Sequence, residues 1–463
     1  MTGLRISAVG AYAPERRVSS EEFAEAWGRF EASGVESVAV PAADEDTLTM
    51  AAAAGRNALD AADVDGEAVE WLAFASTTPP LAEEDLTPRL GSMLGVGEGA
   101  RHHTFTGSTR AGTRALLAAP TDGTALVVVS DAPRGAPDSA EGQGAGAGAA
   151  AFLCTRDGTA EVTQANEHVS PYPGTRFRRT GDEEVTGLGV TSYDRQAFTE
   201  TLAKAAAGVE TDDADAVAVQ SPDGKLPYRA TGALGVEASV VAACETVSEL
   251  GDTGAASVPL SLARALADGH RTVLAAAFGS GAGADALRVE ADGEVPATLE
   301  LDAGESVTYA EYLRLRGEIT REGLDTGAAY VSVPTWRRST PQRHRLVAGE
   351  CPECGALAFP PEGACPGCTD LVEFDPVELP GEGTIEAVTT IGRGGAPPEF
   401  AAQQSRGGAF GVALVRFDRE GESVSLPGQL VGEAEVGDTV RGVIRRIYTQ
   451  EGVTRYGTKF APQ

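Results

Sequence analysis

The chain has 463 residues, 42% of them hydrophobic, and its 68 Asp and Glu outnumber its 37 Lys and Arg, which gives a formal net charge of −31 at pH 7. This length predicts about two to four domains, and the hydrophobic content excludes a disordered or fibrous chain. The acid excess argues against nucleic-acid binding, and no run approaches the roughly 18 apolar residues of a membrane span. The N-terminus lacks the basic-then-apolar pattern of a secretory signal, so we expect a cytoplasmic protein.

The charged residues also indicate the solvent for which the surface is adapted. The carboxylates are spread along the chain, and its only lysines are Lys204, Lys225 and Lys459. Dispersed carboxylates with few lysines suit a protein dissolved in molar salt, where the Debye length falls to about 3 Å. We therefore predict a halophilic protein, although a GC-rich genome would also explain the scarcity of lysine.

Residues 1 to about 300 alternate short apolar runs with alanine-rich amphipathic segments. The apolar runs predict buried strands at 71–76, 125–130, 214–220 and 272–278. The segments between them predict helices at 47–62, 112–119, 198–207 and 257–267. Alternating strands and helices predict an α/β fold with covered sheets.

One pattern occurs twice in this region. The apolar run 125–130 leads through the glycine-rich turn 142–147 into another apolar run, and 272–277 does the same through 279–284. A predicted helix precedes the first strand in both places, so the spacing predicts a duplicated domain. The first turn lacks the G-x-G-x-x-G frame and leads into a strand, so we expect no dinucleotide site there.

The next region predicts a helical connector followed by a small barrel. Residues 309–314 predict a short amphipathic helix, after which Pro334 and Pro341 interrupt the pattern. Beyond about residue 375, short strands separated by glycine-rich turns are predicted at 383–390, 409–417, 422–427 and 439–448. About five short strands of this kind predict a small β-barrel.

Four of the six cysteines form the most specific local motif, which is C-x2-C, ten residues and a second C-x2-C. The motif consists of Cys351, Cys354, Cys365 and Cys368. Proline and glycine in each pair favour tight turns, and two such knuckles predict a closed tetrahedral metal site with a structural role. We expect zinc, although four thiolates also suit iron. Two disulfides are disfavoured in a chain without a secretory signal.

Several segments of the first 320 residues resemble archaeal-type 3-hydroxy-3-methylglutaryl-CoA synthases of the thiolase superfamily. These segments are EDTLTM (45–50), RNAL (56–59), AGT (111–113), GQGAG (142–146), PDGKLP (222–227), GDTG (251–254) and FGSGAG (278–283). Residues from about 325 to 463 resemble the DUF35 family. That family combines a helix, a rubredoxin-like zinc ribbon and an OB-fold associated with acyl-CoA.

The two resemblances imply a duplicated thiolase-like domain of α-β-α-β-α layers, followed by a rubredoxin-like zinc ribbon and a small OB-fold β-barrel. We predict two thiolase-like halves, a helical connector, a zinc ribbon and an OB-fold, at 1–165, 166–320, 321–345, 346–375 and 376–463. The resemblance also implies a coenzyme A thioester as ligand and a homodimer formed through the thiolase-like domain.

The resemblance places the three catalytic positions of the synthase family on residues that lack the required chemistry. The family uses a cysteine as acyl-accepting nucleophile, a glutamate as general acid/base and a histidine that polarises the acceptor thioester. Matched motif by motif, this chain has Thr109 for the cysteine, Thr77 for the glutamate and Gln220 for the histidine. Asp252 stands for the asparagine of the family's Gly-Asn turn. A threonine hydroxyl without a neighbouring base is a poor nucleophile near pH 7.

Other residues near these positions are candidates for binding the ligand. Gln220 can hydrogen-bond a thioester carbonyl, and Lys225 or Arg110 can contact a phosphate of coenzyme A. Lys225 equally fits a solvent-facing turn. Cys154 and Cys244 lie in apolar stretches outside the nucleophile position, so we predict that both are buried.

Three functional hypotheses follow. The first is a non-catalytic, acyl-CoA-binding scaffold or channelling subunit that docks a thiolase, because archaeal DUF35 proteins bridge a thiolase and the synthase. The second is an active acyltransferase or condensing enzyme with altered chemistry, in which His102 or His103 acts as the base. The third is an OB-fold binding module, although the net charge favours CoA phosphates or an acidic partner over nucleic acid. Its candidate residues are Arg441, Arg445, Arg446, Tyr448 and Arg455.

Overall fold

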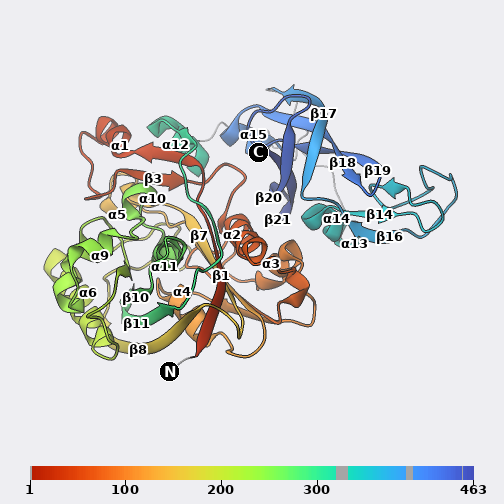
Figure 1. Ribbon diagram of the computed structural model, residues 1–463. Helices are drawn as coiled ribbons and strands as arrows, with labels where there is room; N and C mark the ends of the chain where they lie inside the picture. The colour runs from red at the N-terminus through yellow and green to blue at the C-terminus, as the bar shows by residue number, and fades with distance from the viewer. Residues whose placement is uncertain (1–2, 320–331, 393–399, 451) are drawn as a thin grey trace. The chain divides into compact units, whose positions relative to one another are not determined.

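The computed structural model describes residues 3–319, 332–392, 400–450 and 452–463 (Figure 1). Its internal contacts form two compact units. Unit 1 comprises Met1–Ala42 and Asp46–Tyr312, and unit 2 comprises Ala43–Glu45 and Leu313–Gln463. The finer division into five parts stays a prediction.

Unit 1 contains one ten-stranded mixed sheet. Its strands follow the order β5-β4-β6-β7-β1-β8-β11-β10-β9, and β12 pairs with β1. The strands are β1 (Leu4–Tyr12), β4 (Trp71–Ala75), β5 (Arg101–Phe105), β6 (Ala125–Asp131), β7 (Gly148–Cys154), β8 (Ala160–Tyr172), β9 (Ala216–Val219), β10 (Thr272–Gly279), β11 (Gly281–Ala291) and β12 (Ala297–Glu300). A three-stranded sheet is formed by β2 (Arg16–Ser19), β3 (Ser37–Val40) and β13 (Glu305–Ser306).

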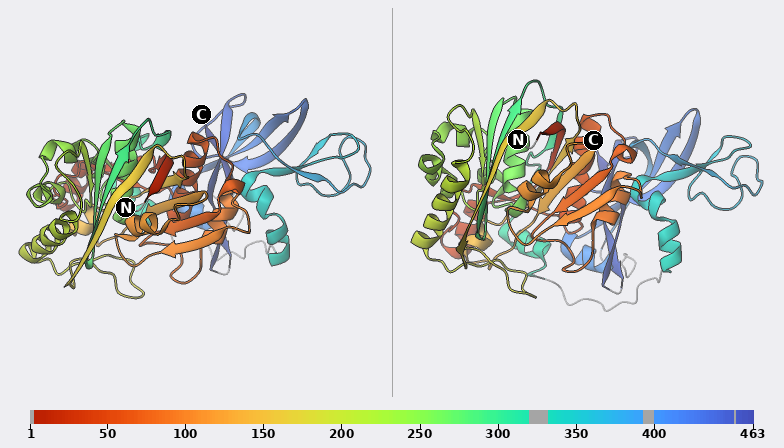
Figure 2. Two further views of the ribbon diagram at one scale, coloured as in Figure 1. Left: turned by 60° about the horizontal axis from the view of Figure 1, so that its bottom comes forward. Right: turned by 90° about the horizontal axis from the view of Figure 1, so that it is seen from below.

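Helices pack against the strands of both halves of unit 1. Helix α2 (Thr47–Ala61) contacts β1, β6 and β7, and α11 (Ser257–Ala267) contacts β1, β7, β9 and β10. Helix α4 (Ala111–Ala118) contacts β4, β5 and β6, and α6 (Thr191–Ala206) contacts β8, β10 and β11 (Figure 2). The shorter helices are α1 (Ser20–Trp27), α3 (Thr87–Leu94), α5 (Ala140–Gln143), α7 (Leu226–Arg229), α8 (Thr231–Leu234), α9 (Ala238–Ala242), α10 (Val247–Leu250) and α12 (Tyr309–Arg316), with 3-10 turns η1 (Gly66–Ala68) and η2 (Gly254–Ala256). Helices and sheet strands therefore alternate in layers, as the sequence predicts.

Helix α2 shows how local sequence starts a central helix. The Asp46 side chain accepts hydrogen bonds from the backbone N–H groups of Leu48 and Thr49, each at 3.0 Å, and Thr49 Oγ1 accepts one from Asp46 N–H at 2.9 Å. This capping box satisfies N–H groups that the first turn leaves without partners. Small side chains then let α2 approach β1 closely, since a Cβ on Gly10 would lie 2.3 Å from Ala54 O.

The predicted repeat corresponds to two antiparallel strand pairs. Strand β6 pairs with β7 after α4, and β10 pairs with β11 after α11. The connections differ, because α5 lies between β6 and β7, whereas β10 and β11 are separated by one residue. All predicted strands and helices of this region are found, although α6 starts at Thr191 instead of 198. The long strand β8 and the edge strand β5 are not among the predicted elements.

Unit 2 contains a three-stranded and a five-stranded antiparallel sheet. The first follows the order β15-β14-β16, and the second the order β19-β18-β17-β20-β21. A bridge between Leu430 and Phe460 and a 2.8 Å hydrogen bond from Val431 N–H to Phe460 O join the two ends of the larger sheet. This closure around buried Val415, Phe417 and Phe460 fits the predicted small barrel. The elements are β14 (Val347–Glu350), β15 (Leu357–Ala358), β16 (Asp375–Glu378), β17 (Glu382–Ile391), β18 (Phe410–Arg419), β19 (Glu422–Gln429), β20 (Thr439–Gln450), β21 (Val453–Pro462), α13 (Val333–Arg338), α14 (Thr340–Arg345) and α15 (Ala401–Gly407).

Only part of the predicted connector can be compared with the structure, because residues 320–331 lie outside the described residues. Pro334 and Pro341 each occupy the first turn of a short helix, α13 and α14. A proline is tolerated there because its missing N–H would have no intrahelical partner. Within the described residues, no helix is both long and apolar enough to cross a bilayer.

Candidate functional site

The predicted nucleophile position, Thr109, is buried two residues before α4. Its hydroxyl donates a 2.6 Å hydrogen bond to the backbone oxygen of Phe278 on β10. Helix α4 can lie this close to the second half because Gly112 has no side chain, and a Cβ there would meet Pro259 at 2.7 Å. The hydroxyl proton of Thr109 is thus held by a peptide carbonyl, which cannot accept it as a base.

Arg110 is buried beside Thr109 and lies within an ion-pair cluster. Its guanidinium contacts the Asp285 carboxylate at 2.8 Å and the Glu167 carboxylate at 2.9 Å. Thr113 also donates a 2.6 Å hydrogen bond to Asp285. Burial raises the pKa of Asp285, which the contacts with Thr113 and Arg110 only partly oppose. The structure therefore places Arg110 in the interior, with both carboxylates as its partners.

Thr77, at the predicted glutamate position, is bound to a buried carboxylate that sequence reasoning missed. Asp131 is fully buried at the end of β6 and accepts the Thr77 hydroxyl at 2.6 Å and its N–H at 3.0 Å. It also accepts hydrogen bonds from Ser76 Oγ at 3.2 Å, Thr78 N–H at 2.8 Å and Ala255 N–H at 2.8 Å. The available signal was its position directly after the predicted strand at 125–130.

Gln220, at the predicted histidine position, is also buried, and its hydrogen bond to η2 connects it to the same region. Its Nε2 donates a 2.8 Å hydrogen bond to Gly254 O, while its Oε1 has no hydrogen-bond partner among the described residues. The Gly254 N–H donates to Asp252 at 2.9 Å, and Asp252 pairs with Arg176. Residues of η2 therefore bond both Gln220 and Asp131, which brings the Thr77 and Gln220 positions into one hydrogen-bond network.

Arg176 is the second residue that sequence reasoning missed, and no motif points to it. Burial lowers the pKa of Arg176, but the Asp252 carboxylate more than offsets this, so the net shift is upward. Its Nη2 is buried and has no hydrogen-bond partner among the described residues. Asp252, at the predicted asparagine position, thus forms an ion pair with a buried guanidinium.

The other candidates lie apart from this network. Lys225 is exposed in a turn whose backbone is fixed by a 2.7 Å hydrogen bond to Asp223. The His103 ring stacks on Trp71 with centroids 4.9 Å apart, and His102 Cε1 lies 3.0 Å from the position of a Cβ on Gly91 in α3. Among the described residues, no hydrogen bond joins either histidine to Thr109, whose hydroxyl donates to Phe278 O.

Cys154 and Cys244 are both buried in unit 1. Burial raises the pKa of each thiol to about 12. Neither cysteine therefore supplies a thiolate near neutral pH.

Unit 1 contains two cavities near these residues, and of the network of η2 only Ser76, in the second cavity, lines either of them. A cavity of about 460 Å³ is lined by carboxylate-rich segments at 136–141 and 179–186. A second, of about 70 Å³, lies between β4, β5 and the segment 79–86. Neither is lined by Thr109, Gln220 or Lys225.

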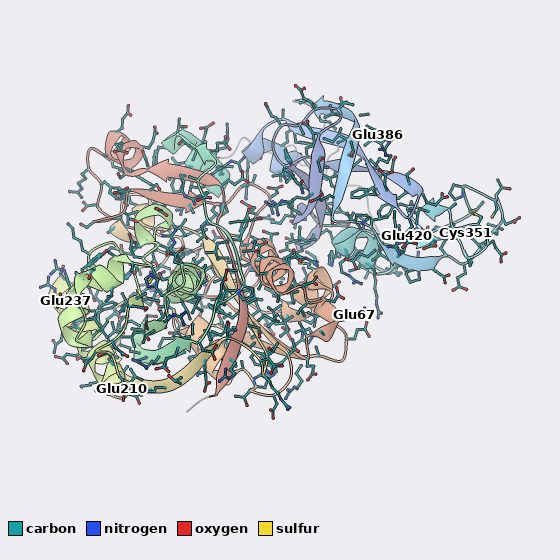
Figure 3. The ribbon with its side chains drawn as sticks, in the orientation of Figure 1. Glu67, Glu210, Glu237, Cys351, Glu386 and Glu420 are labelled. Atoms are coloured by element: carbon teal, nitrogen blue, oxygen red, sulfur yellow. The ribbon has the colours of Figure 1, made fainter. Side chains whose placement is uncertain are left out.

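The four predicted metal ligands converge among the loops of β14, β15 and β16, where Figure 3 shows Cys351. The four sulfur atoms lie within 4.8 Å of one another, with Cys351 and Cys368 at 4.0 Å and Cys354 and Cys365 at 3.5 Å. Tetrahedral zinc with Zn–S bonds of about 2.3 Å requires sulfur separations of about 3.8 Å. Backbone N–H groups of Cys368 and Gly367 lower the pKa of Cys365 to about 6. The donor set therefore fits structural zinc.

Comparisons with known proteins cover both units. Residues 338–372 match the ChsH2 rubredoxin-like zinc ribbon domain, which includes all four cysteines. The hydroxymethylglutaryl-CoA synthase of Methanocella arvoryzae is 29% identical over 69% of this chain and 99% of its own length. That of Methanopyrus kandleri is 28% identical over 67% and 96%.

A solved structure has the same fold as most of the chain. MvaS in complex with 3-hydroxy-3-methylglutaryl coenzyme A superposes with a TM-score of 0.58 at 22% identity, over 70% of this chain and 94% of that protein. This confirms the predicted thiolase-like fold, while the zinc ribbon match confirms the predicted ribbon. The chain therefore combines an N-terminal part homologous to archaeal hydroxymethylglutaryl-CoA synthases with a ChsH2-type zinc ribbon and a small C-terminal barrel.

Proposed function

We propose that this chain is a non-catalytic relative of hydroxymethylglutaryl-CoA synthase that binds an acyl-CoA and serves as a scaffold or channelling subunit. The observation that carries the proposal is the bonding at the three catalytic positions. Thr109 donates to a carbonyl, Thr77 to a buried carboxylate and Gln220 to a carbonyl. Each side chain thus stabilises the fold where the family requires a reactive group.

Acyl transfer through a covalent intermediate needs a nucleophile and a base in contact. The Thr109 hydroxyl has neither a histidine nor a free carboxylate as partner. Asp131 is the buried carboxylate of the neighbouring network, but its oxygens already accept the hydrogen bonds from Thr77, Thr78 and Ala255. Among the described residues, no hydrogen bond joins Asp131 to Thr109.

Binding of a ligand requires no nucleophile or base, unlike catalytic turnover. The site contains polar groups that can bind a ligand. Gln220 Oε1 and Arg176 Nη2 are buried atoms without hydrogen-bond partners among the described residues. One is an acceptor suited to a ligand amide N–H, and the other a donor suited to a thioester carbonyl. MvaS, whose fold this chain shares, was solved with an acyl-CoA bound.

The decisive experiment combines calorimetry with intact mass spectrometry after incubation with acetyl-CoA. We expect saturable binding and no acetyl increment on the protein, because Thr109 lacks an activating base. The Methanocella arvoryzae synthase treated in parallel serves as the control for acyl-enzyme formation. An acetyl adduct on this chain would refute the non-catalytic part of the proposal, and a lack of heat on titration would refute the binding part.

The scaffold role includes a thiolase partner. The resemblance of unit 2 to DUF35, a family that bridges a thiolase and the synthase, supports this part of the proposal. A pull-down with the full chain from an extract of the source organism, at its own salt concentration, is expected to recover a thiolase. Recovery of the chain without any thiolase would argue against the scaffold role.

We also propose a homodimer formed through unit 1. Strand β5 is a terminal strand of the large sheet, and Arg101, His103 and Thr104 on it are exposed. An uncovered strand edge exposes unpaired N–H and C=O groups, which a second copy can satisfy. Light scattering should give a dimer mass that Thr104→Pro reduces to a monomer mass and Thr104→Val preserves. A monomer mass for the unmodified chain would contradict this proposal.

A further inference from the structure

Two segments of unit 2 differ sharply in charge from the rest of the chain. Residues 332–349 and 439–463 contain nine Lys and Arg but one acidic residue, in a protein of net charge −31. Part of this positive charge has a structural role. Lys459 is buried against Asp44 at 2.8 Å, and Arg445 against Glu45 at 3.0 Å. Arg345 also pairs with the Glu378 carboxylate, at 3.2 Å.

Arg343 of α14 and Arg455 of β21 gather around one indole. Their guanidinium carbons lie 4.4 and 4.9 Å from the ring centroid of Trp336 on α13. The Tyr448 ring of β20 meets the same indole edge-on at 6.2 Å. We call Trp336, Arg343, Tyr448 and Arg455 the tryptophan–arginine cluster. Among the described residues, no carboxylate lies within 4.0 Å of either guanidinium.

The cluster also contains polar atoms that lack partners. Tyr448 Oη and Arg455 Nε are buried and make no hydrogen bond with any described residue. The Arg343 side chain donates one hydrogen bond, from Nε to Ser339 Oγ at 2.9 Å. Burial lowers the pKa of Arg343, and the nearby Arg455 charge acts in the same direction. Buried unpaired donors beside two unneutralised cations are costly unless a ligand satisfies them.

We infer that the tryptophan–arginine cluster binds the phosphate monoester of a nucleotide. A guanidinium stacked on an indole keeps its planar edge free to bind phosphate in a bidentate manner. Two such cations match the charge of a phosphate dianion better than that of a carboxylate. The Tyr448 hydroxyl is a further donor for the same ligand.

The aromatic surroundings favour a nucleotide over free phosphate as the source of this group. Trp336 and Tyr448 are only half-buried, and Phe400 lies 6.3 Å from Tyr448. Because the two guanidinium groups lie over Trp336, the rings that can stack against a planar base are those of Tyr448 and Phe400. The site lies wholly within unit 2, so it extends the proposed function, and its test does not depend on the acylation experiment on unit 1.

Trp336 allows the inference to be tested by fluorescence in the full-length chain. The other tryptophans are Trp71, which is buried in the core, and Trp27, which can be replaced by Phe to reduce background. In this background, the ligands to titrate are adenosine 3′,5′-bisphosphate, inorganic phosphate and a single-stranded oligonucleotide, at a salt concentration that maintains the fold. We expect saturable quenching by the bisphosphate and at least about tenfold weaker binding by Arg343→Gln and Arg455→Gln.

Two further variants separate binding from folding. Arg419→Gln removes an arginine that pairs with Glu420 elsewhere in unit 2, and it should bind the bisphosphate normally. Arg455→Lys retains the charge but loses the planar edge, so intermediate affinity would support bidentate binding. If inorganic phosphate bound as tightly as the bisphosphate, the phosphate site would be supported, and its ligand would be free phosphate instead of a nucleotide. No quenching, equal binding by all variants, or preference for the oligonucleotide would overturn the inference.

Discussion

Asp131 and Asp44 are two buried carboxylates with different partners, and each leads to a measurable expectation. Asp131 has at least five hydrogen-bond donors from neighbouring backbone and hydroxyl groups. Asp44 instead faces the buried ammonium of Lys459. Several hydrogen-bond donors together can stabilise a buried carboxylate without an oppositely charged partner. A buried ammonium with one carboxylate partner, in contrast, is left unpaired when that carboxylate is removed.

We predict that Asp131→Asn lowers the free energy of unfolding by about 3 kcal/mol, because an amide cannot accept from all of these donors. Urea unfolding followed by circular dichroism measures the change. Asp157→Asn, at an exposed turn position, is the matched control and should stay within about 0.5 kcal/mol of the unmodified chain. A similar small effect for Asp131→Asn would show that this network adds little to stability.

Asp44→Ala should destabilise unit 2 by about 3–5 kcal/mol, because it leaves the Lys459 ammonium buried and unpaired. The double variant Asp44→Leu with Lys459→Met removes both charges and should recover most of the loss. Urea unfolding monitored by Trp336 fluorescence gives both values. A double variant as unstable as Asp44→Ala would mean that packing, and not the unpaired charge, causes the loss.

The same pair predicts a pH dependence. Burial alone would raise the pKa of Asp44, but the charges of Lys459 and Arg445 lower it overall. A carboxyl group whose pKa is lower in the folded state adds stability above its ordinary pKa of about 3.9, and this is lost as pH falls through the folded value. The free energy of unfolding of the unmodified chain should therefore decrease as the pH falls through the folded-state pKa of Asp44. Asp44→Asn should lack this contribution already near neutral pH. Parallel pH profiles for the two proteins would contradict this.

At this scale, the sequence predicted residues in local motifs better than residues in long-range contacts. The four cysteines were identifiable because turn geometry fixes their spacing. Thr77, Thr109 and Gln220 were located only through a family resemblance. Arg110 and Asp285 are separated by 175 positions along the chain, and no pattern links them before folding.

At the scale of elements, predictability followed hydrophobic pattern. The strand pairs β6–β7 and β10–β11 could be predicted from the sequence because buried strands form continuous apolar runs. Strand β21 was missed because its sequence, VTRYGTKFAP, has neither a long apolar run nor regular alternation of polar and apolar residues. The half-exposed β8 has the same ambiguity. A strand whose sequence has neither a continuous apolar run nor strict alternation gives a weak sequence signal.

In the ribbon formed by β14, β15 and β16, the buried apolar residues other than cysteine are Ala348, Leu357 and Ala358, so we expect its folding to depend on the metal. Cys365→Ser should eliminate the single bound zinc, measured by elemental analysis, and loosen the amides of 351–368 in hydrogen exchange. Cys154→Ala, at a buried thiol of unit 1, should retain the metal. Protection of the ribbon without metal would show that its strands are sufficient for folding.

At the scale of the whole molecule, the acidity is a surface property. Glu67, Glu210, Glu237, Glu386 and Glu420 are all exposed (Figure 3). Carboxylates distributed in this way repel one another at low ionic strength.

We predict that the melting temperature rises by about 10 °C or more between dilute buffer and molar KCl, because salt screens this repulsion. Calorimetry over a KCl series measures it, with an uncharged osmolyte as the control for water activity. A flat response would contradict the halophilic prediction and leave codon composition as the explanation for the scarcity of lysine.

The contact between Thr77 and Asp131 also bears on whether evolution could restore catalysis. Thr77→Glu would return the family's acid but would place a second carboxylate beside fully buried Asp131, where like charges repel. Gln220→His would remove the amide that holds Gly254 in the turn bonded to Asp131. Each reversal taken alone therefore reduces stability before any activity returns. On the proposed function, the catalytic side chains of the family are compatible with this scaffold only when they return together.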